Sequence, residues 1–372
     1  MPHPKFDRDQ LAIKKLAERV NKLSIEKNLI PVSQKPANLS DQDKKVIKKT
    51  ADKIRTARQR QSSVMLTFGA HTIKNGMSPA LIALIKDGWV SHLSTNGAGI
   101  IHDWEFAFQG KSSEDVRENV KNGRFGIWDE TGYFINLALV AGAYEGLGYG
   151  ESIGKMISLE GLNIPEHTFL INEAKKKMEY DPELAAAAID FAGLIRKFKL
   201  ETGFMSIPHP FKKHSVQANA WELKVPFTGH PMFGHDIIYT HPMNHGAAIG
   251  RTALNDFLYY AGSVSNLDHG VYMSLGSAVM SPMIFEKSLS MAQNIEIQHN
   301  NHIDNHFMLI VDLAVSDWDW QKNGEPPPDN PAYYLRYCKT FNRMGGEMQY
   351  LTADNRDFLL ELYQDLSGEN KA

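Results

Sequence analysis

The stretch SVMLTFGAHTIKNGMSPALIALIKDGWVSHLSTNGAG, residues 63–99, decides the fold. Its first eight residues predict a buried strand, because apolar residues alternate through them and the run ends in glycine. The segment SPALIALIKDG predicts a helix that Ser78 caps, that Pro79 suits in the first turn and that Gly88 ends. WVSHLST predicts a second strand, which NGAG follows directly. Strand, helix and strand at this spacing predict the βαβ unit of a parallel sheet.

The rest of the chain continues the same alternation of strand-like and helix-like segments. Helices are predicted over 132–146, 181–201, 254–266, 281–295 (with Ser281 as cap) and 354–366, and strands over 224–229, 270–275 and 306–315. HDIIYTHP (235–242) predicts a strand end, and GLGYGESIG (146–154) a flexible loop, because it follows a helix and lacks the third glycine of GxGxxG. We therefore predict one α/β domain over 63–372, a Rossmann-like and mostly parallel sheet with helices on both faces.

Residues 1–62 differ from the remainder, since they are rich in Lys, Gln, Asp and Arg. The segment QLAIKKLAERVNKL (10–23) has apolar residues at helical spacing, namely Ile13, Leu16, Val20 and Leu23. We predict a helical N-terminal arm, packed either on its own domain or on a neighbouring subunit.

Composition indicates a soluble protein of a reducing compartment. The net charge of -3 gives no basic excess for binding nucleic acid, and the single cysteine, Cys338, cannot form an internal disulfide. No apolar run reaches membrane-spanning length, and the N-terminus MPHPKFDRDQ has no apolar signal core. We expect a cytoplasmic protein without membrane or nucleic-acid partners.

Three glycine-containing loops follow predicted strands: 69–76, 95–99 and 275–282. In a parallel sheet such loops meet at the carboxyl edge, where backbone amides and helix N-termini can hold a phosphate. Gly276 and Ser277, before a helix that starts with proline, suit a pyrophosphate or ribose contact. The alternative is that each glycine only allows the chain to turn from strand to helix.

Fifteen histidines suggest a different class of function, a metal-dependent hydrolase or lyase. They cluster as His230 with His235, His241 with His245, and His299 with His302 and His306. On a helix the last three would share a face, and Asp304 or Asp312 could add an oxygen ligand. No HExxH or comparable spacing is present, so we predict no metal; a histidine in a cleft can act as acid or base without one.

The stretch from Gly69 to Glu105 resembles the NAD-binding segment of deoxyhypusine synthases, with Asn75-Gly76 and Asn96-Gly97-Ala98-Gly99 at the places of that family's Ser-Gly and Thr-Ala-Gly-Gly. LGSAVMSP resembles the family's later glycine turn, and TADNRDFLLELY its C-terminal Ala-Asp contact with NAD. The resemblance implies NAD as cofactor, with contacts from Asn75, Gly76, Asn96, Gly97, Ala98, Gly276, Ser277 and Asp354. It also implies a homo-oligomer, a tetramer with active sites shared between subunits.

In that family NAD takes a hydride from spermidine, and a lysine holds the aminobutyl group as an imine before transfer to a protein lysine. This sequence departs from the family at the substrate residues. The family's acids fall on His102 and His235 here, although Asp103 and Asp236 are adjacent. The family's histidine falls on Ile284, and its lysine falls on Arg336, or on Lys339 after a short insertion.

We therefore expect an NAD-dependent transferase that acts on a small amine and whose specificity has changed. The candidate imine former is Lys339, because guanidinium stays protonated and excludes Arg336. His102 and His235 are the candidate acid and base, and Asp103 and Asp236 the candidate substrate carboxylates. A non-catalytic member of the fold is a third possibility beside the metal-dependent class.

Overall fold

The computed structural model describes residues 3–368, and the chain divides into two compact units. Within the described residues, unit 1 consists of 3–27, 100–218 and 231–256, and unit 2 of 28–99, 219–230 and 257–368. The predicted N-terminal arm is therefore shared between the units. Its boundary at residue 62 stays a prediction.

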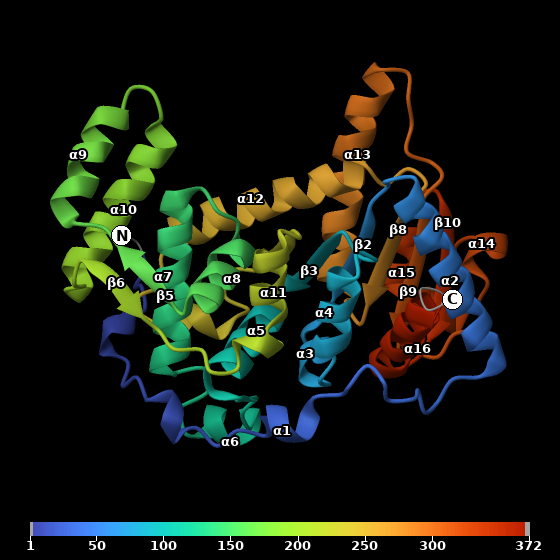
Figure 1. Cartoon of the computed structure of the whole chain (residues 1–372), viewed down its shortest axis with the longest axis horizontal. Helices are drawn as coiled ribbons and strands as arrows, with labels where there is room; N and C mark the ends of the chain where they lie inside the picture. The colour runs from blue at the N-terminus through green and yellow to red at the C-terminus, as the bar shows by residue number, and fades with distance from the viewer. Residues whose placement is uncertain (1–2, 369–372) are drawn as a thin grey trace. The chain divides into compact units, whose positions relative to one another are not determined.

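Unit 2 is built on a six-stranded parallel sheet (Figure 1). Its strands are β2 (Val64–Phe68), β3 (His92–Asn96), β7 (Phe227–His230), β8 (Val271–Leu275), β9 (Phe307–Asp312) and β10 (Glu347–Thr352). They lie in the order β7-β3-β2-β8-β9-β10. Counted along the chain, that order is 3-2-1-4-5-6, the order of the doubly wound Rossmann sheet. The predicted fold class is confirmed.

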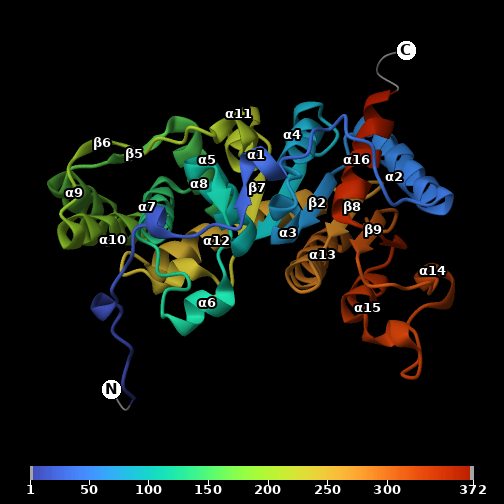
Figure 2. The ribbon, with the colours of Figure 1, turned by 90° about the horizontal axis from the view of Figure 1, so that it is seen from below.

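Helices cover both faces of this sheet, and Figure 2 shows the two layers with β2, β8 and β9 between them. One layer holds α2 (Asp41–Gln59), α4 (Ser78–Lys86) and α16 (Asn355–Gly368); the other holds the end of α12 (Gly246–Ser265), α13 (Met280–Gln298), α14 (Trp320–Asn323) and α15 (Arg336–Asn342). Along β9, Met308 and Ile310 point into the core with α13 and α15, as the period of two in a strand requires. Short segments complete unit 2, namely the end of α1 (Ile25–Asn28), α3 (Ala70–Lys74), the end of α11 (Val216–Leu223) and a 3-10 turn η5 (Pro331–Tyr334).

Unit 1 is mostly helical. It contains most of α5 (Gly97–Gln109), α6 (Val116–Lys121), α7 (Asp129–Glu145), α8 (Tyr149–Leu159), α9 (His167–Lys177), α10 (Pro182–Phe198) and the 3-10 turns η1 (Arg8–Gln10), η2 (Leu16–Glu18), η3 (Lys212–His214) and η4 (Ile237–Thr240). Two small antiparallel sheets pair β1 (Leu23–Ser24) with β4 (Lys111–Ser112), and β5 (Gly161–Ile164) with β6 (Gly203–Ser206). The chain thus leaves the parallel sheet after β3 and returns to it at β7.

Several local predictions are wrong. Residues 10–23 form no continuous helix. The Leu16 amide donates to Glu130 Oε2 at 2.6 Å, a tertiary contact in place of a bond within a helix. Val20 is 83% exposed, so the predicted apolar stripe is not buried as a unit. The supposed loop at 146–154 contains the first turns of α8, whose N-terminal Gly148 amide donates to Glu151. The segment 235–242 forms η4 in place of a strand end.

The predicted serine caps are also wrong. Ser78 and Ser281 lie inside the first turns of α4 and α13, and the N-cap residues are Met77 and Val279, which make no side-chain cap bond. None of the helices within residues 3–368 combines the length and the apolar character needed to cross a membrane.

Candidate functional site

The eight predicted cofactor residues all belong to unit 2, and most lie at the carboxyl edge of its sheet. Strands β2 and β8 are neighbours at this edge, and between them the strand order reverses. The Gly69 amide after β2 donates to the Leu275 carbonyl at 2.9 Å, and a Cβ on Gly69 would overlap the carbonyl oxygen of Gly276. Gly276 has a φ of +55°, which favours glycine. The two backbones therefore meet at the point where such sheets bind ligands.

The turn from β3 into α5 is equally tight. The helix begins at Gly97, directly after the strand ends at Asn96, and the Asn96 side chain accepts a hydrogen bond from the Gly99 amide at 2.9 Å. A Cβ on Gly99 would overlap the Thr95 side chain, so glycine lets the first turn of the helix pack on its strand. The amides of Gly97 and Ala98 lie at the start of this helix, where the helix dipole favours an anion.

The turn from β8 into α13 presents its backbone outward. Gly276, Ala278 and Val279 are exposed, whereas Ser277 is buried and its hydroxyl accepts from the Ser281 amide at 3.3 Å. The structure thus brings Gly276 and Ser277 beside the end of β2, as predicted, with a backbone surface that a ligand can approach.

Asn75, Gly76 and Asp354 have different surroundings in the structure. Asn75 donates to the Asn355 side chain at 3.0 Å, which places it beside half-buried Asp354 at the end of β10. Gly76 is buried with a φ of +79°, and a Cβ there would overlap the Asn28 carbonyl. The chain's own backbone explains that glycine, and its contact with NAD stays a prediction.

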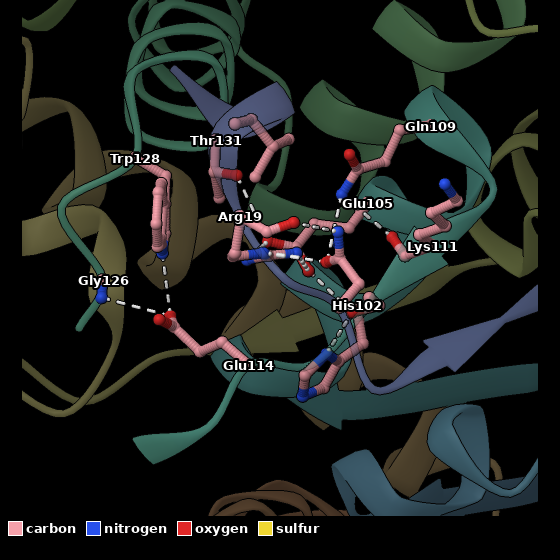
Figure 3. A network of polar contacts seen from close by, with 12 residues as sticks. Arg19, His102, Glu105, Gln109, Lys111, Glu114, Gly126, Trp128 and Thr131 are labelled. Atoms are coloured by element: carbon pink, nitrogen blue, oxygen red, sulfur yellow. Dashed lines mark hydrogen bonds and ion pairs between the residues drawn. The ribbon is translucent and has the colours of Figure 1, made fainter. Parts of the chain in front are cut away.

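In unit 1, His102 stands at the end of a buried polar network (Figure 3). Arg19 binds both oxygens of Glu105 at 2.7 Å, and both side chains are 1% exposed. Burial alone would raise the pKa of Glu105, but the hydrogen bonds and charge of Arg19, with His102 and Ser112, hold that pKa below its ordinary value. Glu105 is therefore an anion that only accepts hydrogen bonds.

That network determines which ring nitrogen of His102 carries the proton. The Ser112 hydroxyl donates its single proton to Glu105 Oε2 at 2.6 Å, so toward His102 Nδ1, 2.7 Å away, it can only accept. Nδ1 must then be the N–H donor, and in the neutral ring Nε2 carries the lone pair. Figure 3 shows Nε2 on the ring edge that points away from Ser112. His102 is thus oriented as a proton acceptor through Nε2.

Asp103, the next residue of α5, has a structural environment. It is 1% exposed, and its carboxylate accepts hydrogen bonds from the Ser215 hydroxyl, the Val216 amide, and the Gln217 amide and side chain at 2.6 to 3.2 Å. Burial raises its pKa in spite of these bonds. Asp103 caps α11, and the geometry does not support the predicted substrate contact, which stays untested.

His235 and Asp236 lie in the loop between β7 and η4. His235 is exposed, and Asp236 is partly buried with its Oδ2 atom inside unit 1. Burial raises the pKa of Asp236 to about 6, against a smaller opposite effect of the charge on His235. This carboxylate can change protonation near neutral pH.

Lys339 lies on α15 in unit 2, whereas His102 and His235 belong to unit 1. Its side chain is 17% exposed, its Nζ atom is 3.4 Å from Glu325 Oε2 and 4.0 Å from the centre of the Tyr333 ring. An ion pair and a cation–π contact are interactions of an ammonium. An imine former must instead attack as a neutral amine, so these contacts give no support to the predicted role of Lys339, which stays a prediction.

The histidine clusters do not assemble a metal site. Among residues 3–368, no group of three or more His, Cys, Asp and Glu side chains could hold a metal ion. Residues 299–306 lie beyond the end of α13 at Gln298, so the three histidines do not share a helical face, and His302 Nδ1 bonds Asp304 within this segment.

No protein-family model and no curated protein sequence matches this chain. Solved structures with a similar fold include AgrE in a ternary complex with ornithine and NAD+ (15% identity, TM-score 0.45, 90% of this chain and 34% of that one). Others are a protein of Methanococcus maripaludis S2 assigned as LOR/SDH (13%, 0.45, 92% and 74%) and one of Entamoeba histolytica assigned as a deoxyhypusine synthase (9%, 0.40, 88% and 90%). This chain spans about a third of the length of AgrE. Similarity at this level does not extend to function.

Proposed function

We propose that this chain is an NAD(H)-dependent enzyme that binds the dinucleotide along the carboxyl edge of the sheet in unit 2. The observation that carries the proposal is the strand order 3-2-1-4-5-6, with glycine turns after both strands at the point of reversal. The residues at this edge suit the group: close-packed glycines at Gly69 and Gly99, outward backbone at Gly276, and polar side chains at Asn96 and Asp354.

The spread of these residues favours an elongated ligand. Asn96 ends β3 and Asp354 follows β10, and these strands are separated by four steps across the sheet. At the usual strand spacing that is about 19 Å. A dinucleotide, with two nucleosides joined by a pyrophosphate, is the class of cofactor that can contact residues at both ends of this span.

We further propose that the substrate is a small amine and that the reaction is an alkyl or aminoalkyl transfer with changed specificity. Bound NAD would supply the acceptor for a hydride. His102, with its tautomer set by Ser112 and Glu105, would accept a proton at Nε2. Lys339 stays the candidate for holding the transferred group, and this role requires its ammonium to lose a proton beside Glu325.

Calorimetric titration of the full chain with NAD and NADH tests cofactor binding. Ala278→Asp places a carboxylate on the exposed turn after β8, so we expect it to weaken binding by about tenfold or more through charge repulsion with the pyrophosphate. Val20→Asp, at an 83% exposed site of unit 1, is the matched control and should bind normally. Absence of binding at millimolar cofactor would refute the proposal.

Borohydride trapping tests the transfer chemistry separately. The chain is incubated with NAD and spermidine, putrescine or agmatine, reduced, and digested for mass spectrometry. An adduct on Lys339 that disappears in Lys339→Ala, but persists in Lys322→Ala, supports amine transfer. Cofactor binding without an adduct on any lysine would refute the amine transfer and would keep the proposal of an NAD-dependent enzyme with a different reaction.

Assembly is also a proposal. We expect a homo-oligomer, a tetramer, in the cytoplasm. Light scattering at micromolar concentration measures the mass, and a monomer of 41.8 kDa would contradict the expectation.

A further inference from the structure

Among the buried oxygen atoms of unit 1 that have no hydrogen-bond partner within residues 3–368, three belong to side chains that interact with one another. They are Tyr149 Oη at the start of α8, Asp236 Oδ2 before η4 and Tyr239 Oη within η4, and we call these three residues the Tyr–Asp cluster. Buried polar atoms are nearly always paired, because an unpaired one loses its bonds to water and gains nothing. Three of them in one small region point to a ligand that pairs them.

The members of the Tyr–Asp cluster are close enough for their charges to interact. Burial raises the pKa of Tyr149 and of Tyr239, and the charge on Asp236 raises both further. Tyr149 is completely buried, and its hydroxyl has no hydrogen-bond partner among residues 3–368. Asp256 is a further neighbour of Tyr149, and its Oδ2 atom accepts from the Gly150 amide at 2.8 Å.

The backbone around the Tyr–Asp cluster is held firmly. Arg8 donates to the Tyr239 carbonyl at 2.8 Å, and the Asn136 side chain donates to the Ile238 carbonyl at 2.9 Å. The Tyr239 ring lies 5.4 Å from that of Phe233, centre to centre. The η4 backbone and the Tyr239 ring are therefore held in place before any ligand arrives, which lowers the entropy cost of binding.

The charge of the cluster decides the class of ligand. One carboxylate and two phenol hydroxyls supply three acceptor positions, and Asp256 adds a second negative charge near Tyr149. Of the basic groups nearby, His235 is exposed, and the Arg8 guanidinium binds the Tyr239 carbonyl and Asn244. An anion would be repelled. A primary ammonium has one positive charge and three N–H donors, which matches three acceptors.

We infer that Tyr149, Asp236 and Tyr239 form a subsite for the primary ammonium group of a small organic amine. The inference deepens the proposed function. It rests on that proposal for the identity of the natural ligand, an amine substrate, but not for the existence of the subsite. Binding of an ammonium can be measured without cofactor, so its failure and that of the NAD proposal are separate results.

Titration of the full chain with n-propylammonium chloride at pH 7, followed by calorimetry or by NMR, tests the inference. We expect saturable binding, and a loss of about tenfold or more in Asp236→Asn and in Tyr149→Phe, because each removes one hydrogen bond to a charged group. Tyr180→Phe, at an 84% exposed tyrosine, is the control and should bind as the unchanged protein does. Tyr149→Phe keeps the test valid where Asp236→Asn fails to fold.

Competing ligands separate the alternatives. Tetramethylammonium has the charge but no N–H donor, and equal binding would overturn the inference. Equal displacement of propylammonium by KCl would also overturn the inference, because the site would then be one for an alkali cation. Absence of saturable propylammonium binding would overturn it as well. NAD affinity should be unchanged in Asp236→Asn; NAD binding that fails while propylammonium binds would sink the cofactor proposal alone.

Discussion

The carboxyl edge of the sheet in unit 2 and the His102 network of unit 1 are built in opposite ways. The edge uses backbone amides and glycines from consecutive residues, as in the turn from Asn96 to Gly99. The network uses side chains far apart in the chain, with Arg19 and Glu105 separated by 86 positions. A backbone site depends on local chain geometry, whereas a side-chain network depends on the whole unit being folded.

The largest effect that we expect concerns the Arg19–Glu105 pair. Arg19→Met leaves a fully buried carboxylate without its cation, which should lower the free energy of unfolding by about 3–5 kcal/mol. Arg19→Met combined with Glu105→Met should recover most of that loss, because no charge stays buried. Urea denaturation at pH 7 measures both, and a single variant as stable as the unchanged protein would show that the network is not structural.

Acid should weaken the same pair. Arg19 holds the pKa of Glu105 in the folded protein below its ordinary value. The stability that the ionised Glu105 contributes is therefore present at neutral pH and is lost as the pH falls through that folded pKa. The double Met variant should lack this part of the acid sensitivity.

Asp236 should show the opposite pH dependence. Its pKa rises from 3.8 to about 6 on folding, so the folded protein binds the proton more tightly and stability falls as pH rises from about 4 to 6. The difference amounts to at most about 3 kcal/mol. Tyr149, Tyr239 and His235 interact with the same carboxylate, and Asp256 lies on the other side of the contact as a neighbour of Tyr149. Denaturation curves from pH 4.5 to 7 should slope for the unchanged protein and flatten for Asp236→Asn; parallel profiles would contradict the assignment.

A smaller effect should come from the backbone contact at the sheet edge. The methyl group of Gly69→Ala overlaps the Gly276 carbonyl, so we expect a loss of about 1–3 kcal/mol and weaker NAD binding. Gly193→Ala, inside α10 with open space around it, should instead stabilise by up to about 1 kcal/mol. Equal stability of the two variants would remove the contrast between a constrained and a free glycine.

The smallest change in stability, about 1 kcal/mol, is expected for Ser112→Ala. Its main effect should be on His102, whose Nδ1 loses its acceptor. Nitrogen NMR of the histidine-labelled protein should show the Nδ1–H form in the unchanged protein and a shifted tautomer balance in Ser112→Ala. Thr131→Ala, which contacts Glu105 but not the ring, should keep the Nδ1–H form. A ring already in the Nε2–H form would refute the proton assignment.

Sequence patterns identified most of the parallel sheet, because strands such as β2 and β8 are buried along their whole length and end in glycine. They missed β10, whose segment EMQYLT alternates polar and apolar residues. The strand order could not be predicted, since pattern shows where strands occur and not which of them pair.

The side-chain sites were only partly predictable. The resemblance pointed to His102 and Asp236, but nothing local to them indicates Ser112 or Tyr149 as partners. The resemblance indicates Asp103 as a substrate acid because it adjoins His102, where one of the family's acids falls, whereas in the structure its carboxylate accepts from the first amides of α11. A carboxylate seven residues before a serine, as in Glu105 and Ser112, is too common a spacing to be a signal.

The pairing of β3 with β7 has a consequence for how the chain folds. Leu93 aligns with Phe227, yet residues 97–226 lie between the two strands and include most of unit 1. Closing so long a loop costs entropy before any strand contact forms, and sheets with distant pairings fold slowly. During synthesis, β2 and β3 leave the ribosome long before the strand that will cover the edge of β3. That edge, with its unpaired backbone groups, is therefore a place where a newly made chain is exposed to association with another copy.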